Sequence, residues 1–416
     1  MRYLRGICRF TIGVIFILSG FLKAIDPIGN SLKIEEYLKV FHLDFLDIIS
    51  LPAAVLLSTV EFVIGVCILK GLKIRLFSKI ALFFVSFFTL LTLYSAIFNP
   101  VQDCGCFGEA LHLTNWETFF KNIILLICAI IIYLQRDKFE PIASSRWKYL
   151  YIACYTSIIF GISIYALRYI PQIDFGTFKA GTKLAFTASA QPEQEYETVF
   201  TYAKDGQEKL FTLENLPDST WTFVKSDTKL VSTSFNVNSH SELILKNSDG
   251  VYVTDEIIES DNPVFVLSVY DCNKINERDL EKIITLHNSI TSNGAEFYIL
   301  SGNSPEDTEA LFSTTGYNCL NTFDILYTDY KSTLSLNRSN AGLTYIDNSH
   351  IVKKWSSNNY PKNIRKLLDE VSEVLTASVT IKEQLFAEIT IAFILFLIAI
   401  VRFISKRIYN KEPIES

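Results

Sequence analysis

The sequence is short of charge: 20% of its 416 residues are Asp, Glu, Lys or Arg, whereas a soluble globular protein has about 25%. With 49% hydrophobic residues, a disordered chain, a coiled coil and a collagen are excluded. The net charge of -6 leaves no basic excess, so nucleic acid is excluded as a partner. The apolar residues gather in long uncharged runs, which indicates an integral membrane protein in a lipid bilayer.

Six apolar runs are long enough to cross a bilayer, which takes about 20 mostly apolar residues. They lie near residues 7–22, 51–69, 76–98, 119–134, 147–170 and 385–404. The first run follows three arginines, as in a signal peptide, but no small-residue cleavage site comes after it. We therefore expect an uncleaved span.

Lys and Arg gather at both chain ends and in alternate connections between the runs, as they do in cytoplasmic segments. These clusters contain Arg2, Arg5 and Arg9, then Lys70, Lys73, Arg75 and Lys79, then Arg136, Lys138, Arg146 and Lys148, then Arg402, Lys406, Arg407 and Lys411. Segment 99–118 has no Lys or Arg. We predict a multi-pass protein of a bacterial inner membrane, with both termini cytoplasmic and residues 171–384 periplasmic.

The long segment 171–384 has 18 basic and 30 acidic residues and no spanning run, so it is an acidic soluble region. Residues 171–258 contain short strand-like runs around Asp205-Gly206 and Asp249-Gly250, which are hairpin signals. Two further strands are predicted at 220–224 and 229–232.

Residues 259–378 alternate between strands and helices, beginning with a buried type of strand at 264–270. The other strands are predicted at 296–300, 325–327, 343–346 and 350–355, and the helices at 276–291, 305–314, 330–336 and 361–375. The order βαβαβαββα is typical of a thioredoxin fold with an insertion. Overall we predict an α-helical membrane bundle with an α+β extracytoplasmic region.

The redox signature of a thioredoxin is missing from this region. A thioredoxin has Cys-x-x-Cys at its first strand–helix junction, where the helix dipole stabilises a thiolate. Here Cys272 stands alone and Ile275 takes the second position, while Ala341 stands where a proline precedes the hairpin. We therefore predict a degenerate binding or scaffold domain. Cys272 is either a small half-buried residue or a secondary thiol.

The eight cysteines divide into two groups. Cys8, Cys67, Cys128 and Cys154 lie in or at the ends of predicted spans, where packing is their expected role. Cys104, Cys106, Cys272 and Cys319 lie in the predicted outside segments, a compartment that permits disulfides in a bacterium.

Cys104-Gly105-Cys106 is the sharpest local signal, in a loop at the membrane surface. A disulfide across one residue closes a very small ring, so it stabilises little. Strained, exposed disulfides are the more oxidising and labile ones, which favours a redox pair over a structural bridge. A zinc or copper site with Asp103, Glu109 and His112 is the rival interpretation, although the spacing fits no usual zinc pattern. Pairing with Cys272 or Cys319 stays open.

Glu61 lies near the middle of the second apolar run. A carboxylate at that depth costs about 2.5–3.5 kcal/mol on insertion scales, so it faces the bundle interior or is protonated. It either handles protons or a ligand, or it bonds to a neighbouring helix, with Lys23 as a candidate partner.

Three motifs of the first 137 residues, SGFLKAIDP at 19–27, VEFVIG at 60–65 and DCGCFG at 103–108, resemble the DoxX-like superfamily and, within it, the methylamine-utilisation protein MauE type. The later chain is similar to the outside domain fused to such bundles in Bacteroidetes. The resemblance implies a four-span bundle over 1–137. The residue patterns described above predict the rest of the chain as a fifth span at 147–170, a β-rich segment at 171–258, a thioredoxin-like domain without Cys-x-x-Cys at 259–378 and a sixth span at 385–405. The resemblance also implies a helper in methylamine metabolism that matures a disulfide-rich protein, with Cys104 and Cys106 carried over.

Three functions follow from these features. The first is a membrane thiol–disulfide relay or maturation factor, an oxidoreductase in which Cys104 and Cys106 exchange electrons with a periplasmic client or redox partner. A quinone is a candidate acceptor, although no quinone motif is visible. The second is a non-enzymatic scaffold of an envelope complex. The third is a small-molecule carrier that uses Glu61 and Lys23, although no inverted repeat stands out.

Overall fold

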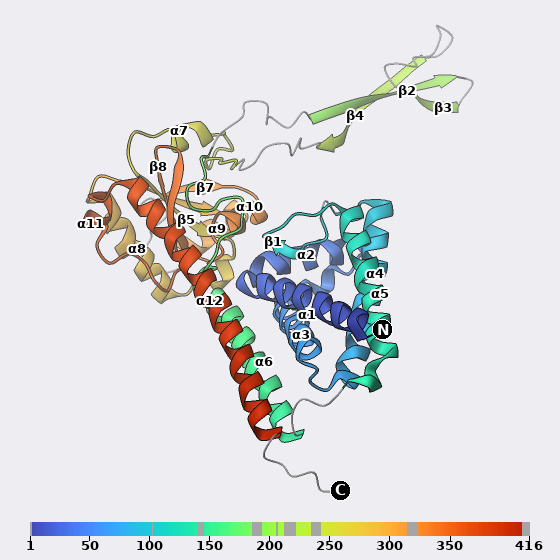
Figure 1. The fold of residues 1–416 in the computed structure, drawn as a ribbon. Coiled ribbons are helices and arrows are strands. Elements are labelled where there is room, and N and C mark those ends of the chain that lie inside the picture. Colours follow the sequence, from blue (N-terminus) through green and yellow to red (C-terminus); the bar gives the residue numbers. More distant parts are fainter. Residues whose placement is uncertain are drawn as a thin grey trace.

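The structure is a computed structural model that describes residues 2–101, 103–139, 145–184, 194–204, 207–211, 222–233, 243–313 and 323–409. Its side chains are described except in 2, 145–147, 194–233, 391 and 393–409. The chain forms a helical bundle and an α+β region, from which the long helix α12 (Ser372–Tyr409) extends (Figure 1). Cys319 lies outside the described residues.

The N-terminal part is helical. Its elements are α1 (Arg2–Ile25), α2 (Pro27–Val40), the short 3-10 helix η1 (Asp44–Ile49), α3 (Ser50–Lys70), α4 (Ile74–Phe98), α5 (Asn115–Leu134), η2 (Arg136–Lys138) and α6 (Ser145–Arg168). Among the described residues, five helices are long and apolar enough to cross a membrane, and they correspond to the first five predicted runs, the fifth helix spanning Lys148–Arg168. The prediction of a membrane helical bundle followed by a soluble α+β region is therefore confirmed.

One helix of this part was not predicted. α2 lies between the first two spans, where Asp26 caps it by accepting a hydrogen bond from the Gly29 N–H at 2.9 Å. Pro27 occupies the first helical turn, where its missing N–H has no cost. The helix carries Lys33, Glu35 and Glu36 among its apolar residues, so its sequence has no clear apolar stripe.

Helices α1 and α3 pack backbone to backbone through glycines. A Cβ on Gly20 would lie 2.5 Å from the Phe62 nitrogen, and one on Gly65 would lie 2.7 Å from the Ile17 nitrogen. Small residues allow this close approach in membranes, where dispersion contacts replace the hydrophobic drive. The contact brings Lys23 of α1 beside Glu61 of α3.

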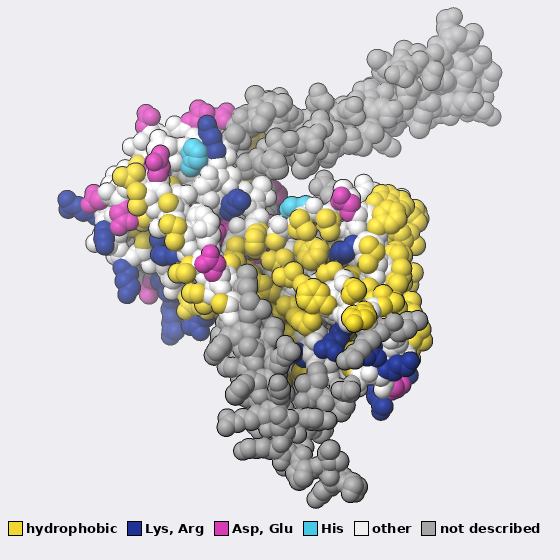
Figure 2. All heavy atoms as spheres, viewed as in Figure 1, with side chains coloured by type: hydrophobic (Ala, Val, Ile, Leu, Met, Phe, Trp, Pro, Cys, Tyr) yellow, Lys and Arg dark blue, Asp and Glu magenta, His cyan; other side chains and the backbone are white. Residues whose placement is uncertain are grey.

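The outer face of the bundle is apolar. Large side chains on α4 and α5 are exposed, and Figure 2 shows apolar side chains covering this part of the molecule. They include Phe83, Phe87, Leu90, Phe120 and Ile124. Such a wide apolar face fits acyl chains better than water.

The α+β region is built on a mixed five-stranded sheet in the order β7-β6-β5-β8-β9. β5 (Val264–Val269), β6 (Glu296–Ser301) and β7 (Asp324–Tyr327) run parallel, whereas β8 (Gly342–Asp347) is antiparallel to β5 and β9 (His350–Trp355) is antiparallel to β8. The remaining elements are α7 (Thr254–Ile258), η5 (Cys272–Lys274), α8 (Glu277–Thr291), α9 (Pro305–Ser313), α10 (Tyr330–Leu336) and α11 (Ile364–Leu368).

This sheet is covered on both faces, so β5 is buried along its whole length. Phe265 and Leu267 pack with Ile283 of α8 on one face. Val264 and Val266 pack with Leu245 and other residues of a second cluster on the opposite face. The sequence of β5 is almost entirely apolar because side chains on both faces of the strand lie in a core.

The end of the chain differs from the prediction. The helix expected at 361–375 is divided, because α11 ends at Leu368 and α12 begins at Ser372. α12 (Ser372–Tyr409) runs without a break through the sixth apolar run. Most side chains of that run lie outside the described residues.

A separate sheet has the order β3-β2-β4, with β2 (Gln194–Lys204), β3 (Gln207–Phe211) and β4 (Thr222–Thr233) all antiparallel. The predicted hairpin strands around 205–206 are present, while those two turn residues lie outside the described part of the chain. The two strands expected at 220–224 and 229–232 are one strand, β4. The predicted hairpin at 249–250 is reduced to a turn with one bridge between Lys246 and Tyr252.

The α1–α3 contact makes a direct prediction about stability. Gly20→Ala places a methyl group against the α3 backbone, which cannot turn away as a side chain can. We expect about 1–3 kcal/mol of destabilisation, measured as a lower apparent melting temperature in detergent. Gly161→Ala on α6 is the control, because nothing lies within 4 Å of its Cβ position. Equal melting temperatures for both variants would contradict this account of the packing.

Candidate functional site

The Cys-Gly-Cys loop lies between α4 and α5 and leads into β1 (Cys106–Glu109). Gly105 and Gly108 have φ values of 63° and 61°, and the Gly108 N–H donates to the Gly105 carbonyl at 3.0 Å. A Cβ on Gly105 would also lie 3.0 Å from Cγ of Lys33. Glycine is therefore required between the two cysteines both by the left-handed backbone and by the close side chain.

The two cysteines lie side by side. Their Sγ atoms are 3.6 Å apart, within hydrogen-bond distance and not joined in a disulfide in this structure. The Tyr37 hydroxyl of α2 donates to the Cys104 sulfur and also lies 3.1 Å from Ser95 Oγ of α4. Both cysteines are half-buried.

The two thiols have opposite acidities. The hydrogen bond with Cys104 lowers the pKa of Cys106, and the positive charges of Lys121 and Lys23 lower it further against the effects of burial and Glu61. The same hydrogen bond and burial raise the pKa of Cys104. Cys106 is therefore the more acidic thiol of a coupled pair, and a thiolate forms on it before one forms on Cys104.

A buried ion pair lies beneath the loop. Lys23 Nζ is 2.6 Å from Glu61 Oε2 and also donates to Ser19 Oγ at 3.2 Å. The Ser19 hydroxyl in turn donates to the Cys106 carbonyl, and the Asn30 amide holds the Lys23 carbonyl. Lys23, the candidate partner of Glu61 in the sequence analysis, therefore does form an ion pair with it, and both side chains are buried.

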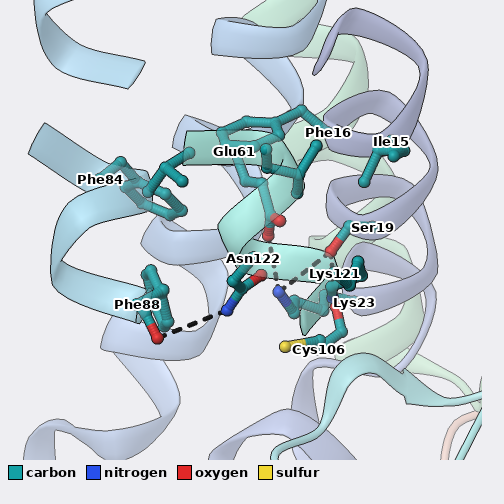
Figure 3. A pocket seen from close by; sticks show the side chains of 12 residues that line it. Ile15, Phe16, Ser19, Lys23, Glu61, Phe84, Phe88, Cys106, Lys121 and Asn122 are labelled. Atoms are coloured by element: carbon teal, nitrogen blue, oxygen red, sulfur yellow. Dashed lines mark hydrogen bonds and ion pairs between the residues drawn. The ribbon is translucent and has the colours of Figure 1, made fainter. Parts of the chain in front are cut away.

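A cavity of about 30 Å³ connects this ion pair to the loop, and Cys106, Lys23 and Glu61 all contribute to its wall (Figure 3). It is lined by Ile15, Phe16, Ser19, Lys23, Glu61, Phe84, Val85, Phe88, Cys106, Lys121, Asn122 and Leu125. The volume is close to that of one water molecule. Most of the wall is apolar, so charges inside it are weakly screened.

Asp103 fixes the start of the loop. Its carboxylate accepts from Lys33 Nζ at 2.9 Å and lies 2.7 Å from His112 Nδ1. These contacts hold the pKa of Asp103 below its usual range despite burial. Among the side chains that the structure describes, no group of three or more His, Cys, Asp and Glu is arranged to hold a metal ion.

The α+β region contacts this loop through Arg338. Its guanidinium lies 2.8 Å from Glu109 of β1 and 3.1 Å from Asp26, the cap of α2. Only 6% of Arg338 is exposed, and the two carboxylates raise its pKa against the effect of burial. Lys331 adds a second contact to Glu36 at 2.9 Å.

The other predicted thiols are not brought to this pair. Cys272 lies in η5, where its sulfur is 4.0 Å from Thr308 Oγ1 and burial raises its pKa. It is a free cysteine, and no disulfide joins it to Cys104 or Cys106. Asn340 accepts from the backbone N–H groups of Tyr270 and Asp271, so it ties this junction to the turn before β8.

Sequence reasoning missed three residues of the site. Tyr37 stood in a segment with no predicted helix, and Lys121 was a lone cation near the start of a predicted span. Arg338 lies between a predicted helix and a predicted strand, and no role was predicted for it. Of these residues, Lys121 alone carried a signal, because it is a cation inside the predicted apolar run 119–134.

Comparisons with known proteins match parts of the chain. Residues 1–135 match the family model of methylamine utilisation protein MauE, and residues 196–233 match a domain of unknown function, DUF8463. Protein TlpB of Flavobacterium psychrophilum is 26% identical over 141 residues, which cover 33% of this chain and 38% of that protein. The match therefore spans less than two fifths of TlpB. No solved structure matches.

The acidity of Cys106 depends on Lys121, which gives a testable prediction. Lys121→Gln removes a positive charge that stabilises the thiolate, so the pKa of Cys106 rises and its alkylation needs a higher pH. We expect the half-maximal alkylation rate to move up by about one pH unit. The rate is followed by mass spectrometry of the Cys106 peptide.

The matched control is Lys282→Gln, which removes a half-exposed lysine paired with Asp279 in the α+β region. Its profile should overlay that of the wild type. An unshifted Lys121→Gln profile would show that Lys121 does not act on Cys106.

Proposed function

We propose that this multi-pass membrane protein is a thiol–disulfide exchange factor, with Cys104 and Cys106 as its redox pair. The main support is the pair of sulfur atoms 3.6 Å apart, in which the positive charges of Lys121 and Lys23 help to lower the pKa of Cys106. The pair lies at the end of a membrane bundle and beside a soluble region that is able to present clients.

The expected direction is oxidation of the client. Hydrogen bonding and positive charge stabilise the Cys106 thiolate, so they stabilise the reduced form of the pair. A dithiol whose reduced form is stabilised has a higher reduction potential and acts as an oxidant when its disulfide is formed. A disulfide across Cys-Gly-Cys closes a small, strained ring, and strain makes a disulfide easier to reduce, so it also favours oxidation of the client.

The exchange begins at Cys104. A client thiolate attacks the Cys104 sulfur, the Cys104–Cys106 bond breaks, and its electron pair leaves on Cys106, which is the better leaving group because its pKa is lower. The second client thiolate then attacks the client sulfur of the mixed disulfide. Cys104 leaves and takes one proton, while the other client proton goes to solvent.

The reduced pair must then be oxidised again by a two-electron acceptor. A disulfide of a redox partner satisfies this chemistry by the reverse exchange. A quinone remains the other candidate, but the cavity below Cys106 has about 30 Å³, which is less than a quinone ring needs. A quinone would have to reach the sulfurs by another route.

The soluble region is proposed as a degenerate thioredoxin-like domain that binds clients. Its strand order, with three parallel strands and an antiparallel hairpin, supports that interpretation. Cys272 is buried with a raised pKa, which suits packing better than nucleophilic attack. The orientation in a bacterial inner membrane, with this region periplasmic, is part of the same proposal.

A role in maturation follows from the likeness to the MauE family. That likeness covers residues 1–135, which include Cys104, Cys106, Lys23 and Glu61. We propose that the protein assists disulfide formation in a client, as a helper of the MauE type would in methylamine metabolism.

The second candidate is a scaffold for an envelope complex. The buried contacts of Arg338 with Asp26 and Glu109 favour it, because they fix the soluble region on the bundle without any redox step. In that case Cys104 and Cys106 shape a turn and stay in one redox state in growing cells.

Mixed disulfides separate the two candidates. In Cys106→Ser no disulfide forms within the pair, so Cys104 joins a client only by the reverse exchange, in which its thiolate attacks a disulfide of the client or redox partner and the other sulfur of that disulfide leaves as a thiolate. Cys106 is then missing for the step that releases this mixed disulfide, so adducts that reductant removes should accumulate at least several-fold on non-reducing gels of acid-quenched cells. Cys104→Ser should give none, and Cys272→Ser should behave as wild type. Adducts in Cys104→Ser but not in Cys106→Ser would reverse the roles. Their absence from every variant would favour the scaffold.

A further inference from the structure

A second cavity lies where the soluble region meets α6 and α12, away from the cysteines. It has a volume of about 180 Å³. Its walls are formed by the chain after α6, by β9, by Arg338 and by α12 ahead of its apolar run. The lining residues are Ile170, Pro171, Gln172, Asp174, Ala180, Arg338, Lys353, Lys354, Val379, Lys382 and Glu383.

Two cations of this cavity have no carboxylate at ion-pair distance among the residues that the structure describes. Arg338 is held by Asp26 and Glu109, and Lys354 lies 2.8 Å from Asp174. Lys353 and Lys382 form no ion pair among the described residues, and Lys353 Nζ only lies over the Trp355 ring, 5.3 Å from its centre.

Glu383 is the remaining acid of the cavity, and it offsets the positive charges of Lys353 and Lys382 only in part. Burial lowers the pKa of Lys353, and the positive charge of Lys382 lowers it further against a smaller effect of Glu370. Burial raises the pKa of Glu383, whose Oε1 already accepts from the Asp174 N–H at 3.4 Å. Two cations that repel each other inside a cavity are relieved by a bound anion.

A neutral group also lacks a partner. The side-chain nitrogen and oxygen of Gln172 are both buried, and neither has a hydrogen-bond partner among the described residues. Buried polar atoms without a partner are rare in native proteins and call for a ligand, an ion or a water. The Gln172 amide offers N–H donors at the same cavity as Lys353 and Lys382.

The position of the cavity relative to the apolar helix segments indicates which class of ligand can reach it. The α6 span ends at Arg168, two residues before the first lining residue. On α12, Lys382 comes shortly before the apolar run that starts at residue 385. The cavity therefore lies at the height where two helices leave the acyl region, which is the level of lipid headgroups. On the cytoplasmic side of membranes, basic pockets between membrane helices bind the phosphate groups of anionic lipids, and the same chemistry applies to a basic pocket at the headgroup level of the other side.

We propose that this cavity binds a phosphate-bearing anion, with Lys353 and Lys382 supplying charge and the Gln172 amide donating a hydrogen bond. An anionic phospholipid headgroup and free phosphate share this chemistry. The site is independent of the thiol pair, because neither Cys104 nor Cys106 lines it.

The test uses the full-length protein purified in detergent with phosphatidylcholine. Phosphatidylglycerol or inorganic phosphate is titrated in, and bound ligand is counted by native mass spectrometry. The variant is Lys353→Gln with Lys382→Gln. The control is Lys362→Gln with Lys366→Gln, which removes the same charge from two exposed positions that do not line the cavity. Gln172→Leu is a second variant that leaves the charge unchanged.

We expect phosphatidylglycerol to bind the wild type and the control equally and the double lysine variant about 30-fold more weakly. Gln172→Leu should bind about tenfold more weakly. Binding of inorganic phosphate with the same dependence on these residues would also support the site and would identify a free anion as its ligand. Equal binding of phosphatidylglycerol by all proteins, or binding of neither probe by the wild type, would overturn the proposal.

Discussion

The ion pair between Lys23 and Glu61 is the constraint on which the site depends. Its two charges lie 2.6 Å apart in a bundle that crosses a membrane, where breaking such a pair leaves an uncompensated buried charge that costs about 3–5 kcal/mol. The pair needs α1 and α3 in backbone contact, which Gly20 and Gly65 permit. It also directs Lys23 toward Ser19, whose hydroxyl holds the Cys106 carbonyl. The loop with the two sulfurs is thereby fixed on top of a charged, poorly screened site.

The soluble region is attached by charge to the same end of the bundle. Its cations meet carboxylates on the membrane part, with Arg338 on Asp26 and Glu109 and Lys331 on Glu36. Glu109 belongs to the strand that starts at Cys106, so docking and loop geometry are coupled through three residues of backbone. A client held by the soluble region would therefore lie close to Cys104. The same coupling would serve a scaffold, which is why the redox state of the pair decides between the two functions.

Much of the fold could be predicted from the sequence because it rests on local patterns. Apolar runs gave the spans, and the alternation after residue 259 gave the order of strands and helices of the five-stranded sheet. Cys104-Gly105-Cys106 and Glu61 were also visible, since each residue type is unusual in its setting. α2 was missed because its apolar residues do not form a stripe, and the division between α11 and α12 was missed because the sequence around Asp369 and Glu370 contains no proline or glycine.

The contacts that organise the site could not be predicted in the same way. Arg338 and Asp26 are 312 residues apart in the chain, and Arg338 and Glu109 are 229 apart. Such pairs depend on how two folded parts meet, and no periodicity reports that. The different acidities of Cys104 and Cys106 arise first from the hydrogen bond between them and from the burial of Cys104. Lys121 and Lys23, which come from two separate helices, lower the pKa of Cys106 further.

The most direct test of the central claim is the reduction potential of the Cys104–Cys106 pair in the purified full-length protein, measured by equilibration in glutathione buffers and alkylation. A stabilised thiolate predicts a potential above about −220 mV, among the oxidising exchange pairs. A pair that stays oxidised below about −300 mV, as structural disulfides do, or that forms no disulfide at all, would contradict the account.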